Sequence, residues 1–158
     1  MIDKAVIKGN SLFADFNDGQ LGKLAAIFSE RSFKAGEIAI PEHAECKEMM
    51  ILVEGRMAVE VSMSLSASAE KTVVTMEDNP GRIIEWSTAI DTTKAGATAG
   101  ARAVADTRVI VADGADVLRL LQQDKELGWK FMHKILLVIA SRLKDTRLQL
   151  VSLAAQCR

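Results

Sequence analysis

The C-terminal part of the chain carries the feature that most restricts its fold, an apolar repeat that extends from Asp124 to about Leu153. Its members recur at alternating spacings of three and four, which is the a and d pattern of a heptad repeat held for about four heptads. Asp124 is a favoured helix N-cap type, so we predict one long helix that begins there. The predicted seam consists of Trp129, Met132, Leu136, Ile139, Leu143, Thr146, Leu150 and Leu153.

A second apolar stripe, formed by Phe131, Ile135 and Val138, accompanies only the first half of this repeat. We therefore expect one helix face to pack on the chain's own core and the seam to pack on a second copy, which gives a homodimer. A single wide core face is the alternative. The continuation of the seam beyond the second stripe favours the homodimer, and the polar Thr146 within it would also fix the register of the two helices.

A different pattern occupies residues 31–112, where short β-type runs alternate with turn residues such as Gly36, Pro41 and Gly55. Many short strands at this spacing indicate a sandwich or barrel. Helix-type periodicity precedes this region in residues 1–30 and returns after Asp113 with a short helix around residues 117–121. We predict strands at 33–36, 37–40, 49–53, 57–63, 72–76, 82–90 and 107–111, and a flexible hairpin tip at 64–70.

The charge balance argues against a nucleic-acid partner, because 20 Lys and Arg residues against 21 Asp and Glu residues leave a net charge of −1. Tyrosine is absent and aromatic residues make up 4%, so few side chains could stack on bases. No apolar run is long enough to span a membrane. The N-terminal sequence lacks the features of a signal peptide, so we expect a cytoplasmic protein whose Cys46 and Cys157 are reduced.

Four pieces of the sequence form an ordered set: Ala35–Ile38, Ile51–Val59, Val109–Asp113 and Arg142–Thr146. In this order and spacing they resemble the barrel entry, hairpin, last strand and dimer helix of cyclic-nucleotide-binding domains of the catabolite activator and FNR type. The resemblance extends over nearly the whole chain. It implies a mainly β fold, a double-stranded β-helix or jelly roll with flanking helices. The single domain of residues 1–158 would contain N-terminal helices (1–30), a β-roll (31–112) and C-terminal helices (113–158) that include the long dimer helix.

In that family the ligand lies against a phosphate-binding cassette. A Glu of the cassette accepts a hydrogen bond from a ribose hydroxyl, and an Arg neutralises the charge of the phosphate. The matching stretch here is Gly81–Ile90, with Glu85 at the ribose position, and Lys94 follows nine residues later. Thr146 matches the place on the dimer helix that touches the purine. The resemblance therefore implies a regulatory sensor that binds cAMP or cGMP and signals through the dimer helix. Its implied ligand-binding residues are Glu85, Trp86, Ser87, Thr88, Lys94, Thr98, Arg142 and Thr146.

The cassette departs from the family pattern in three places. Ile84 stands where the family has a Gly that lets the backbone approach the ligand, and Trp86 is large for a site that admits a ribose phosphate. Lys94 cannot supply the bidentate fork of an Arg. These departures leave open a different anion or a small apolar ligand. They also leave open an alternative function, a ligand-free dimeric protein-interaction module whose pocket is filled by Ile84 and Trp86.

The sequence shows no pattern typical of an enzyme, so we expect no catalytic residues. His43, Glu45, Cys46 and Glu48 are close in sequence, but His133 is the only other histidine. A cupin-type metal site uses a cluster of histidines, so we expect no bound metal. A P-loop, a Gly-x-Ser-x-Gly motif and paired catalytic carboxylates are also absent from the sequence.

The position of the dimer helix also bears on partners. In the regulators that the chain resembles, this helix leads into a helix-turn-helix that binds DNA. Here the sequence ends at Arg158, about one turn after the seam. We therefore expect no direct DNA binding, and an output that is supplied by an unknown protein partner.

Overall fold

A computed structural model describes residues 1–62, 71–91, 93 and 96–156 of the chain. Three short helical segments come first: α1 (Lys4–Lys8), the 3-10 turn η1 (Ser11–Phe13) and α2 (Asp18–Ile27). The side chains of Asn17 and Gln20 form a reciprocal capping box at the start of α2. The predicted helical character of the N-terminal segment is therefore confirmed as far as Ile27, and the first strand begins at Ser29.

Eight strands follow within the described residues, and they form two four-stranded sheets with the orders β1-β8-β3-β6 and β2-β7-β4-β5. All pairings are antiparallel. Except for the β4–β5 hairpin, each strand is followed by one in the opposite sheet, which is the winding of a jelly roll and confirms the predicted fold class. The strands are β1 (Ser29–Phe33), β2 (Ile38–Ile40), β3 (Glu48–Glu54), β4 (Met57–Ser62), β5 (Lys71–Glu77), β6 (Ile83–Glu85), β7 (Gly100–Ala103) and β8 (Thr107–Asp113).

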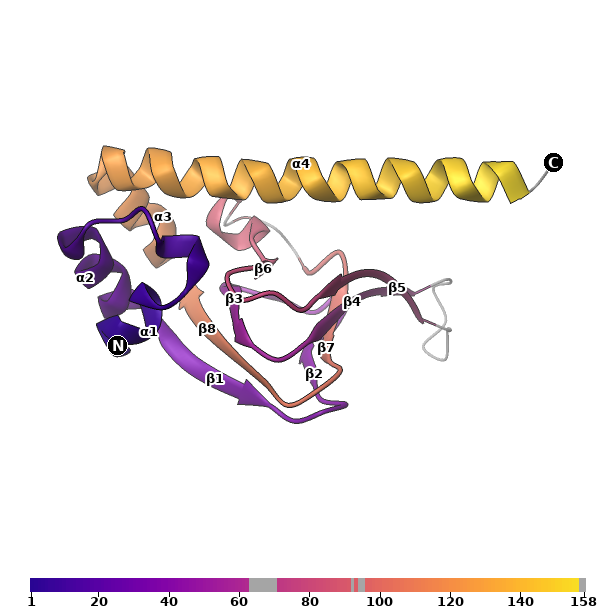
Figure 1. Cartoon of the computed structure of the whole chain (residues 1–158), viewed down its shortest axis with the longest axis horizontal. Coiled ribbons are helices and arrows are strands. Elements are labelled where there is room, and N and C mark those ends of the chain that lie inside the picture. The colour runs from indigo at the N-terminus through magenta and orange to yellow at the C-terminus, as the bar shows by residue number, and fades with distance from the viewer. Residues whose placement is uncertain (63–70, 92, 94–95, 157–158) are drawn as a thin grey trace.

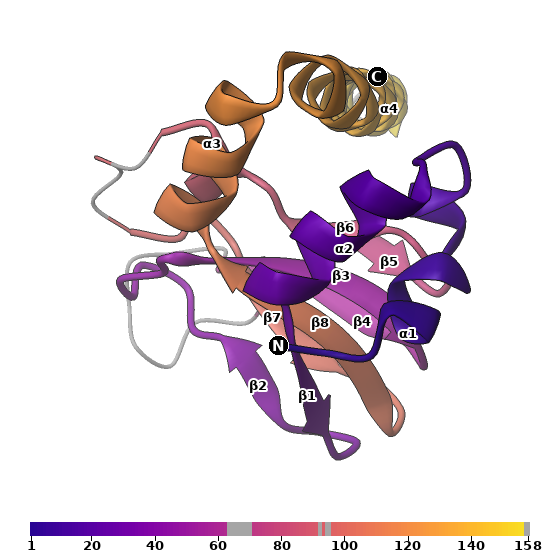
Figure 2. The ribbon, with the colours of Figure 1, turned by 90° about the vertical axis from the view of Figure 1, so that its left-hand side faces the viewer.

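The middle of β3 in the first sheet is buried on both faces, which explains its apolar run from Met49 to Val53. Met50 and Leu52 face the interior of the roll and pack in a core shared with the second sheet. Met49 and Ile51 face the other way, into a core shared with the helices. Successive side chains of a strand point to opposite faces, so a strand between two cores needs apolar residues at every position. Figure 2 shows the helices gathered over one side of the sheets.

Two helices complete the chain, α3 (Gly114–Gln123) and α4 (Lys125–Gln156). The Asp124 carboxylate accepts a hydrogen bond from the backbone N–H of Leu127 at 3.0 Å, which confirms the predicted start of the long helix. α4 has 32 residues and runs along the longest dimension of the molecule (Figure 1). Neither it nor another helix in the described part of the chain carries an apolar stretch that could cross a membrane.

Aromatic packing fixes the first half of α4 on the domain. Phe131 of α4 lies 6.2 Å from Phe13 and 6.4 Å from Phe16, measured between ring centroids, and Phe28 lies 6.2 Å from Phe13. All four side chains are buried. Edge-to-face and tilted contacts at these separations add to the stabilisation that burial itself supplies. The chain has five Phe residues, so most of its phenylalanine content serves this junction.

The turn between β3 and β4 depends on a glycine. Gly55 has a φ of +96°, and a Cβ at this position would lie 2.5 Å from the carbonyl oxygen of Asp106. Any other residue would therefore be strained and would clash with backbone. The resemblance implies a hairpin at Ile51–Val59; the structure has two strands joined by a tight turn there, but β3 and β4 belong to opposite sheets and do not pair with each other.

Some strand predictions are wrong in position. The strand predicted at 33–36 is instead Ser29–Phe33, a mostly polar and exposed strand, and Gly36 turns the chain with a φ of +91°. The run predicted at 82–90 is a strand only as far as Glu85 and then forms the 3-10 turn η2 (Ser87–Ala89). β7 was not predicted, because its small residues resemble a loop; Ala101 and Ala103 are buried where the two sheets approach. The predicted hairpin tip at 64–70 lies outside the described residues.

Candidate functional site

A cavity of about 340 Å³ opens between η2, β7 and α4, and we call it the roll pocket. This volume lies within the range of small-molecule pockets. Residues far apart in the sequence meet here, because the winding of the roll places β4 and β7 beside the segment that follows β6. The described lining residues are Ile40, Val59, Ile84, Glu85, Trp86, Ser87, Ile90, Asp91, Thr98, Ala99, Gly100, Ala101 and Arg142.

Glu85, the last residue of β6, holds the start of η2. Ser87 donates both its backbone N–H, at 2.7 Å, and its hydroxyl, at 2.5 Å, to Glu85 Oε1. The residue at the N-cap position of η2 is Trp86, whose side chain makes no capping hydrogen bond. The Glu85 carboxylate therefore acts as the acceptor that a helical turn needs for its first free N–H.

Arg142 brings α4 to the same pocket. Its Nη2 donates to the Ile83 carbonyl oxygen at 2.7 Å and lies 3.2 Å from Glu77 Oε1, and both Nη atoms lie 3.4 Å from the Ile84 carbonyl oxygen. The Glu77 side chain is 1% exposed and also pairs with Arg82 at 2.7 Å. Arg142 Nε is buried and has no hydrogen-bond partner among the described residues. One side chain thus joins the long helix to the strand that lines the pocket.

Ile84 and Trp86 form part of the pocket wall. Ile84 is 4% exposed and packs in the core of the roll, and Trp86 is half-buried against the core on the helix side. The Ile84 side chain therefore lies in the core of the roll, and the Trp86 ring packs against the helix-side core. The cavity beside them stays open, so these two side chains do not fill it.

Comparison with known sequences identifies the family of this fold. Residues 30–124 match the cyclic nucleotide-binding domain, a segment that is more than half of the chain. The chain belongs to this family. The resemblance to this family that the sequence shows is thereby confirmed. No curated protein matches the sequence significantly.

Solved structures of cyclic nucleotide-binding domains and related regulators share the fold. A cyclic nucleotide-binding domain from Methylobacillus flagellatus KT aligns with a TM-score of 0.73 at 16% identity, over 94% of this chain and 80% of that one. The Thermus thermophilus catabolite activator protein aligns at 0.70 and 17% identity, over 90% of this chain and 62% of that one. The sensor domain of the transcriptional regulator DNR from Pseudomonas aeruginosa aligns at 0.68 and 15% identity, over 89% and 91%.

The structure brings most of the predicted ligand-binding residues together. Glu85, Trp86, Ser87, Thr98 and Arg142 all line the roll pocket. They come from β6, the η2 turn, the loop before β7 and the middle of α4, so the pocket joins the cassette to the long helix.

Two other residues of the predicted ligand site, Thr146 and Lys94, are not part of the described pocket lining. Thr146 is exposed and is not among the described lining residues; its hydroxyl donates to the Arg142 carbonyl oxygen of its own helix at 2.9 Å. It lies one turn beyond Arg142, where the helix has left the pocket. Lys94, the predicted phosphate-neutralising residue, lies outside the described part of the chain.

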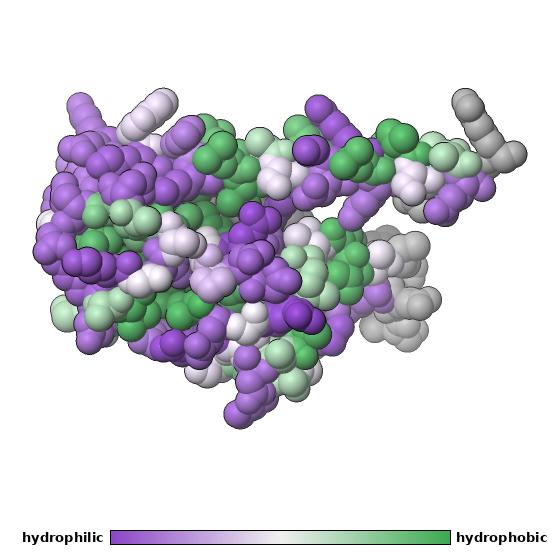
Figure 3. Space-filling view, in the orientation of Figure 1, coloured by the Kyte–Doolittle hydropathy of each residue, from purple (hydrophilic) through white to green (hydrophobic). Residues whose placement is uncertain are grey.

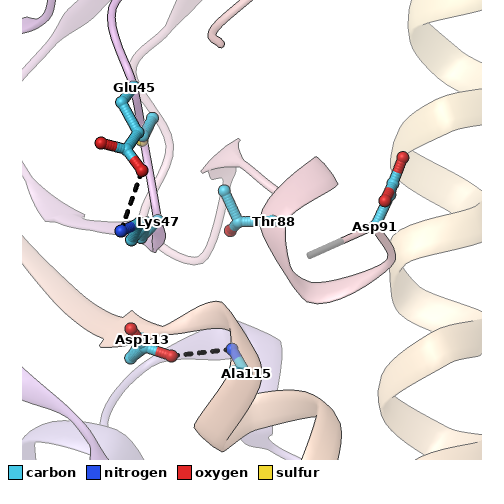
Figure 4. A pocket seen from close by; sticks show the side chains of 7 residues that line it. Glu45, Lys47, Thr88, Asp91, Asp113 and Ala115 are labelled. Atoms are coloured by element: carbon cyan, nitrogen blue, oxygen red, sulfur yellow. Dashed lines mark hydrogen bonds and ion pairs between the residues drawn. The ribbon is translucent and has the colours of Figure 1, made fainter. Parts of the chain in front are cut away.

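Thr88 lines a second, smaller cavity that we call the junction cavity. It measures about 110 Å³ and lies between residues 45–47, η2 and the start of α3 (Figure 4). Thr88 is 3% exposed, and its hydroxyl has no hydrogen-bond partner among the described residues. Beside it, the hydrogen bond from Lys47 to Glu45 raises the pKa of the Lys47 ammonium group. A Cβ at Gly114 would lie 2.2 Å from the Thr88 carbonyl oxygen, so η2 sits directly against α3.

The predicted seam of α4 is largely exposed. Met132 and Ile139 are half-buried against the helix-side core, whereas Phe131 and Ile135 of the second stripe are fully buried there and Val138 packs against it. The second stripe therefore packs on the chain's own domain, as predicted. Figure 3 shows apolar residues along the outer edge of the helix. The exposed fractions are 73% for Trp129, 56% for Leu136, 49% for Leu143 and 66% for Leu150, while the side chain of Leu153 is outside the described part.

The region considered for metal binding contains a turn and the start of β3. Within the described residues no group of three or more His, Cys, Asp or Glu side chains could hold a metal ion. His43 is exposed in a turn with a φ of +64°, and Cys46 donates weakly to the Glu48 carbonyl oxygen at 3.5 Å. Glu48 itself pairs with Arg31 of β1 at 2.7 Å.

Sequence reasoning missed Glu77 and the part of the pocket wall formed by residues 99–101. Glu77 ends a strand whose other residues are mostly exposed, so nothing in the sequence distinguishes it from a solvated carboxylate. The small residues 99–101 were interpreted as a loop. Val59 could have been found, because the alternation from Met57 to Val61 already places it on the inner face of the roll.

Proposed function

We propose that this protein is a non-enzymatic regulatory sensor, a single domain that binds a small molecule in the roll pocket and signals through α4 to a second copy of the chain. The observation that carries this proposal is the position of Arg142. It lines the pocket, belongs to the long helix, and is bonded to two carbonyl oxygens of the cassette strand. A ligand that changes the surroundings of this one side chain therefore acts on both elements.

The attachment of α4 supports this route. Among the described residues beyond Ser141, the side chains that bond to the sheets are Arg142 and Gln149, whose amide donates to the Val74 carbonyl oxygen at 3.2 Å. A helix held by so few polar contacts can take up two positions of similar free energy. A ligand shifts such an equilibrium by its difference in affinity for the two positions.

The exposed seam supports signalling between two copies. Leu143 and Leu150 lie in the half of α4 that projects along the roll, and both are about half-exposed or more. An a and d seam of this kind is buried when two helices pair. A shift of α4 on its own domain would then change the angle or register at which two copies meet.

The family makes cAMP and cGMP the first ligands to test, with another anion as the next. The chain belongs to the cyclic nucleotide-binding domain family, and Glu85 and Ser87, which the resemblance assigns to the cassette, line the roll pocket. The alternative is a ligand-free interaction module whose pocket is filled by Ile84 and Trp86. The open pocket argues against it, because a cavity of about 340 Å³ remains beside these two side chains.

Hydrogen–deuterium exchange of α4 tests the proposal. The full chain is measured alone and with saturating cAMP, cGMP or Prodan, a neutral naphthyl ketone. A ligand that binds the roll pocket should change the protection of residues 142–156, while residues 127–135, anchored in the helix-side core, stay unchanged. In Arg142→Gln, at a ligand concentration raised until this variant is saturated as well, the bound ligand should leave α4 unaffected. If bound ligand leaves α4 unchanged in the unmodified protein, the proposed signal route is wrong.

A further inference from the structure

We infer that the roll pocket selects an uncharged, mainly apolar ligand with one hydrogen-bond acceptor, and that Glu85 excludes phosphate from it. This inference rests on the proposed function, because it concerns the chemistry of the ligand that the same pocket binds. It differs from the role that the resemblance implies for Glu85, which is to accept a ribose hydroxyl.

The first step concerns the donors at the start of η2. A phosphate bound there needs N–H and O–H groups that point at its oxygens. In this structure both such groups of Ser87 already donate to Glu85 Oε1, at 2.7 Å and 2.5 Å. Glu85 thus supplies the negative charge that a bound phosphate would supply. A second anion would have to compete with this carboxylate for the same donors.

The second step concerns the positive charge available. The charged side chains among the described lining residues are Glu85, Asp91 and Arg142, two acidic and one basic. The Nη atoms of Arg142 are directed to backbone carbonyl oxygens and to the buried carboxylate of Glu77. Its Nη donors are therefore already engaged before a ligand arrives, although Glu77 also pairs with Arg82. Lys94, outside the described residues, takes no part in this argument.

The third step concerns what remains for a ligand. Arg142 Nε is buried and has no partner among the described residues, and a buried donor without an acceptor is unfavourable. A ligand with one well-placed acceptor would satisfy it. Most of the other lining residues are apolar, including Val59, Trp86 and Ile90. A pocket with one free donor and apolar walls favours a neutral molecule such as an aromatic ketone or ester.

Prodan carries one carbonyl acceptor on an apolar ring system and no charge, so it is the probe for this pocket. Its fluorescence should shift to the blue on binding the full-length protein, and 1 mM cAMP, roughly the concentration at which even weak ligands are bound, should not displace it. Arg142→Lys, which lacks the Nε–H donor, should weaken Prodan binding about tenfold. Circular dichroism establishes that each variant is folded.

A matched pair of variants separates the pocket from the exposed apolar edge of α4, which could also bind a dye. Ala99→Phe fills the roll pocket, and Ala105→Phe places the same ring on the exposed β7–β8 turn. Prodan binding should be lost in the first variant and kept in the second. Equal binding by both variants would show that the dye sits elsewhere and would overturn the assignment.

Glu85→Ala gives the sharpest distinction, because the two roles of Glu85 predict opposite results. If Glu85 excludes phosphate, this variant should bind cAMP at least tenfold more tightly than the unmodified protein in calorimetry, since the Ser87 donors are released. If Glu85 instead binds ribose, the variant should lose cAMP affinity. Tight cAMP binding by the unmodified protein, weakened in Glu85→Ala, would overturn this inference and leave the sensor proposal intact. If Prodan does not bind the unmodified protein, this inference fails; the sensor proposal is tested separately by the hydrogen-exchange measurement on α4.

Discussion

The two halves of α4 are held in different ways. In the first half, Leu127, Phe131 and Ile135 are fully buried in the helix-side core. In the second half, Leu148 and Val151 are among several large apolar residues that are exposed. That half is bonded to the sheets by polar groups, chiefly the Arg142 guanidinium. Figure 1 shows this half extending along the roll beyond the helical end of the domain.

This difference separates the anchor of the helix from the part that can respond. Burial of a large apolar side chain contributes about 1.5–3 kcal/mol, so three such residues fix the first half firmly. A hydrogen bond to a charged group contributes about 1.5–3 kcal/mol, so Arg142 is a single connection of moderate strength in the second half. A ligand that competes for that connection can move the second half without unfolding the first.

The largest effect on folding is expected when the anchor itself is removed. Phe131→Ala deletes a buried ring that contacts Phe13 and Phe16 and should lower the free energy of unfolding by about 3–5 kcal/mol, measured by urea denaturation. Trp129→Ala is the matched control, because that larger ring is on the same helix but 73% exposed. Equal losses in the two variants would contradict the division between buried and exposed faces.

A smaller effect is expected from loosening the polar connection. Glu77→Gln removes the buried charge that Arg82 and Arg142 share and should lower the free energy of unfolding by about 1–3 kcal/mol. Hydrogen exchange should become faster in residues 142–156 and stay unchanged in residues 127–135. Asp78→Asn, at the exposed neighbouring position, is the control. Unchanged protection of the second half would show that the Glu77 contact does not hold it.

The same division explains what could be predicted from the sequence. The start of α4 and the burial of Phe131, Ile135 and Val138 follow from local capping and periodicity, so both were predicted correctly. The ordered motifs also pointed to residues 81–90, of which Glu85, Trp86 and Ser87 line the roll pocket. These signals are local, because a cap or a stripe is defined by residues within one or two turns.

Other details of the site could not be predicted from the sequence, because they depend on contacts between distant segments. Glu77 matters only because a residue 65 positions away on α4 reaches it. β7 forms although its residues have little strand propensity, because Ala101 and Ala103 fit between closely packed sheets. The division of Ser87 and Thr88 between two cavities is likewise set by Gly114, where α3 meets η2. No local pattern reports such contacts.

A weaker, pH-dependent contribution is expected where the anchored half begins. The hydrogen bond from Lys23 and the backbone N–H of Leu127 lower the pKa of Asp124. Because the folded pKa lies below the unfolded value of about 3.9, the stabilisation is present above that value and is lost as the pH falls through the folded pKa. Asp124→Asn, which keeps a good N-cap, should therefore lower the melting temperature slightly at pH 7, and this difference should shrink and then vanish as the pH falls through the folded pKa.

A control on the second half completes this comparison. Asp145 is exposed on α4 and forms no ion pair among the described residues, so Asp145→Asn should leave the melting temperature at pH 7 unchanged. A difference between Asp124→Asn and the unmodified protein that persisted at low pH would show that the amide disturbs the cap itself. The ion pair with Lys23 would then not be the cause.

The least effect on the folded domain is expected from the seam of the second half, although its effect on assembly should be complete. Leu143→Lys with Leu150→Lys replaces side chains that are 49% and 66% exposed in one copy, so the unfolding of the single domain should not change. Two copies paired along the seam would bury four ammonium groups, so sedimentation should show only monomer.

Leu137→Lys with Leu148→Lys makes an equal change on exposed residues outside the seam and should leave the dimer intact. Loss of the dimer in both pairs of variants would mean that the partner covers the whole outer face of α4, and persistence in both would mean that the copies meet elsewhere. Only a dimer lost in the first pair and kept in the second assigns contact between copies to the half of the helix that the pocket can move.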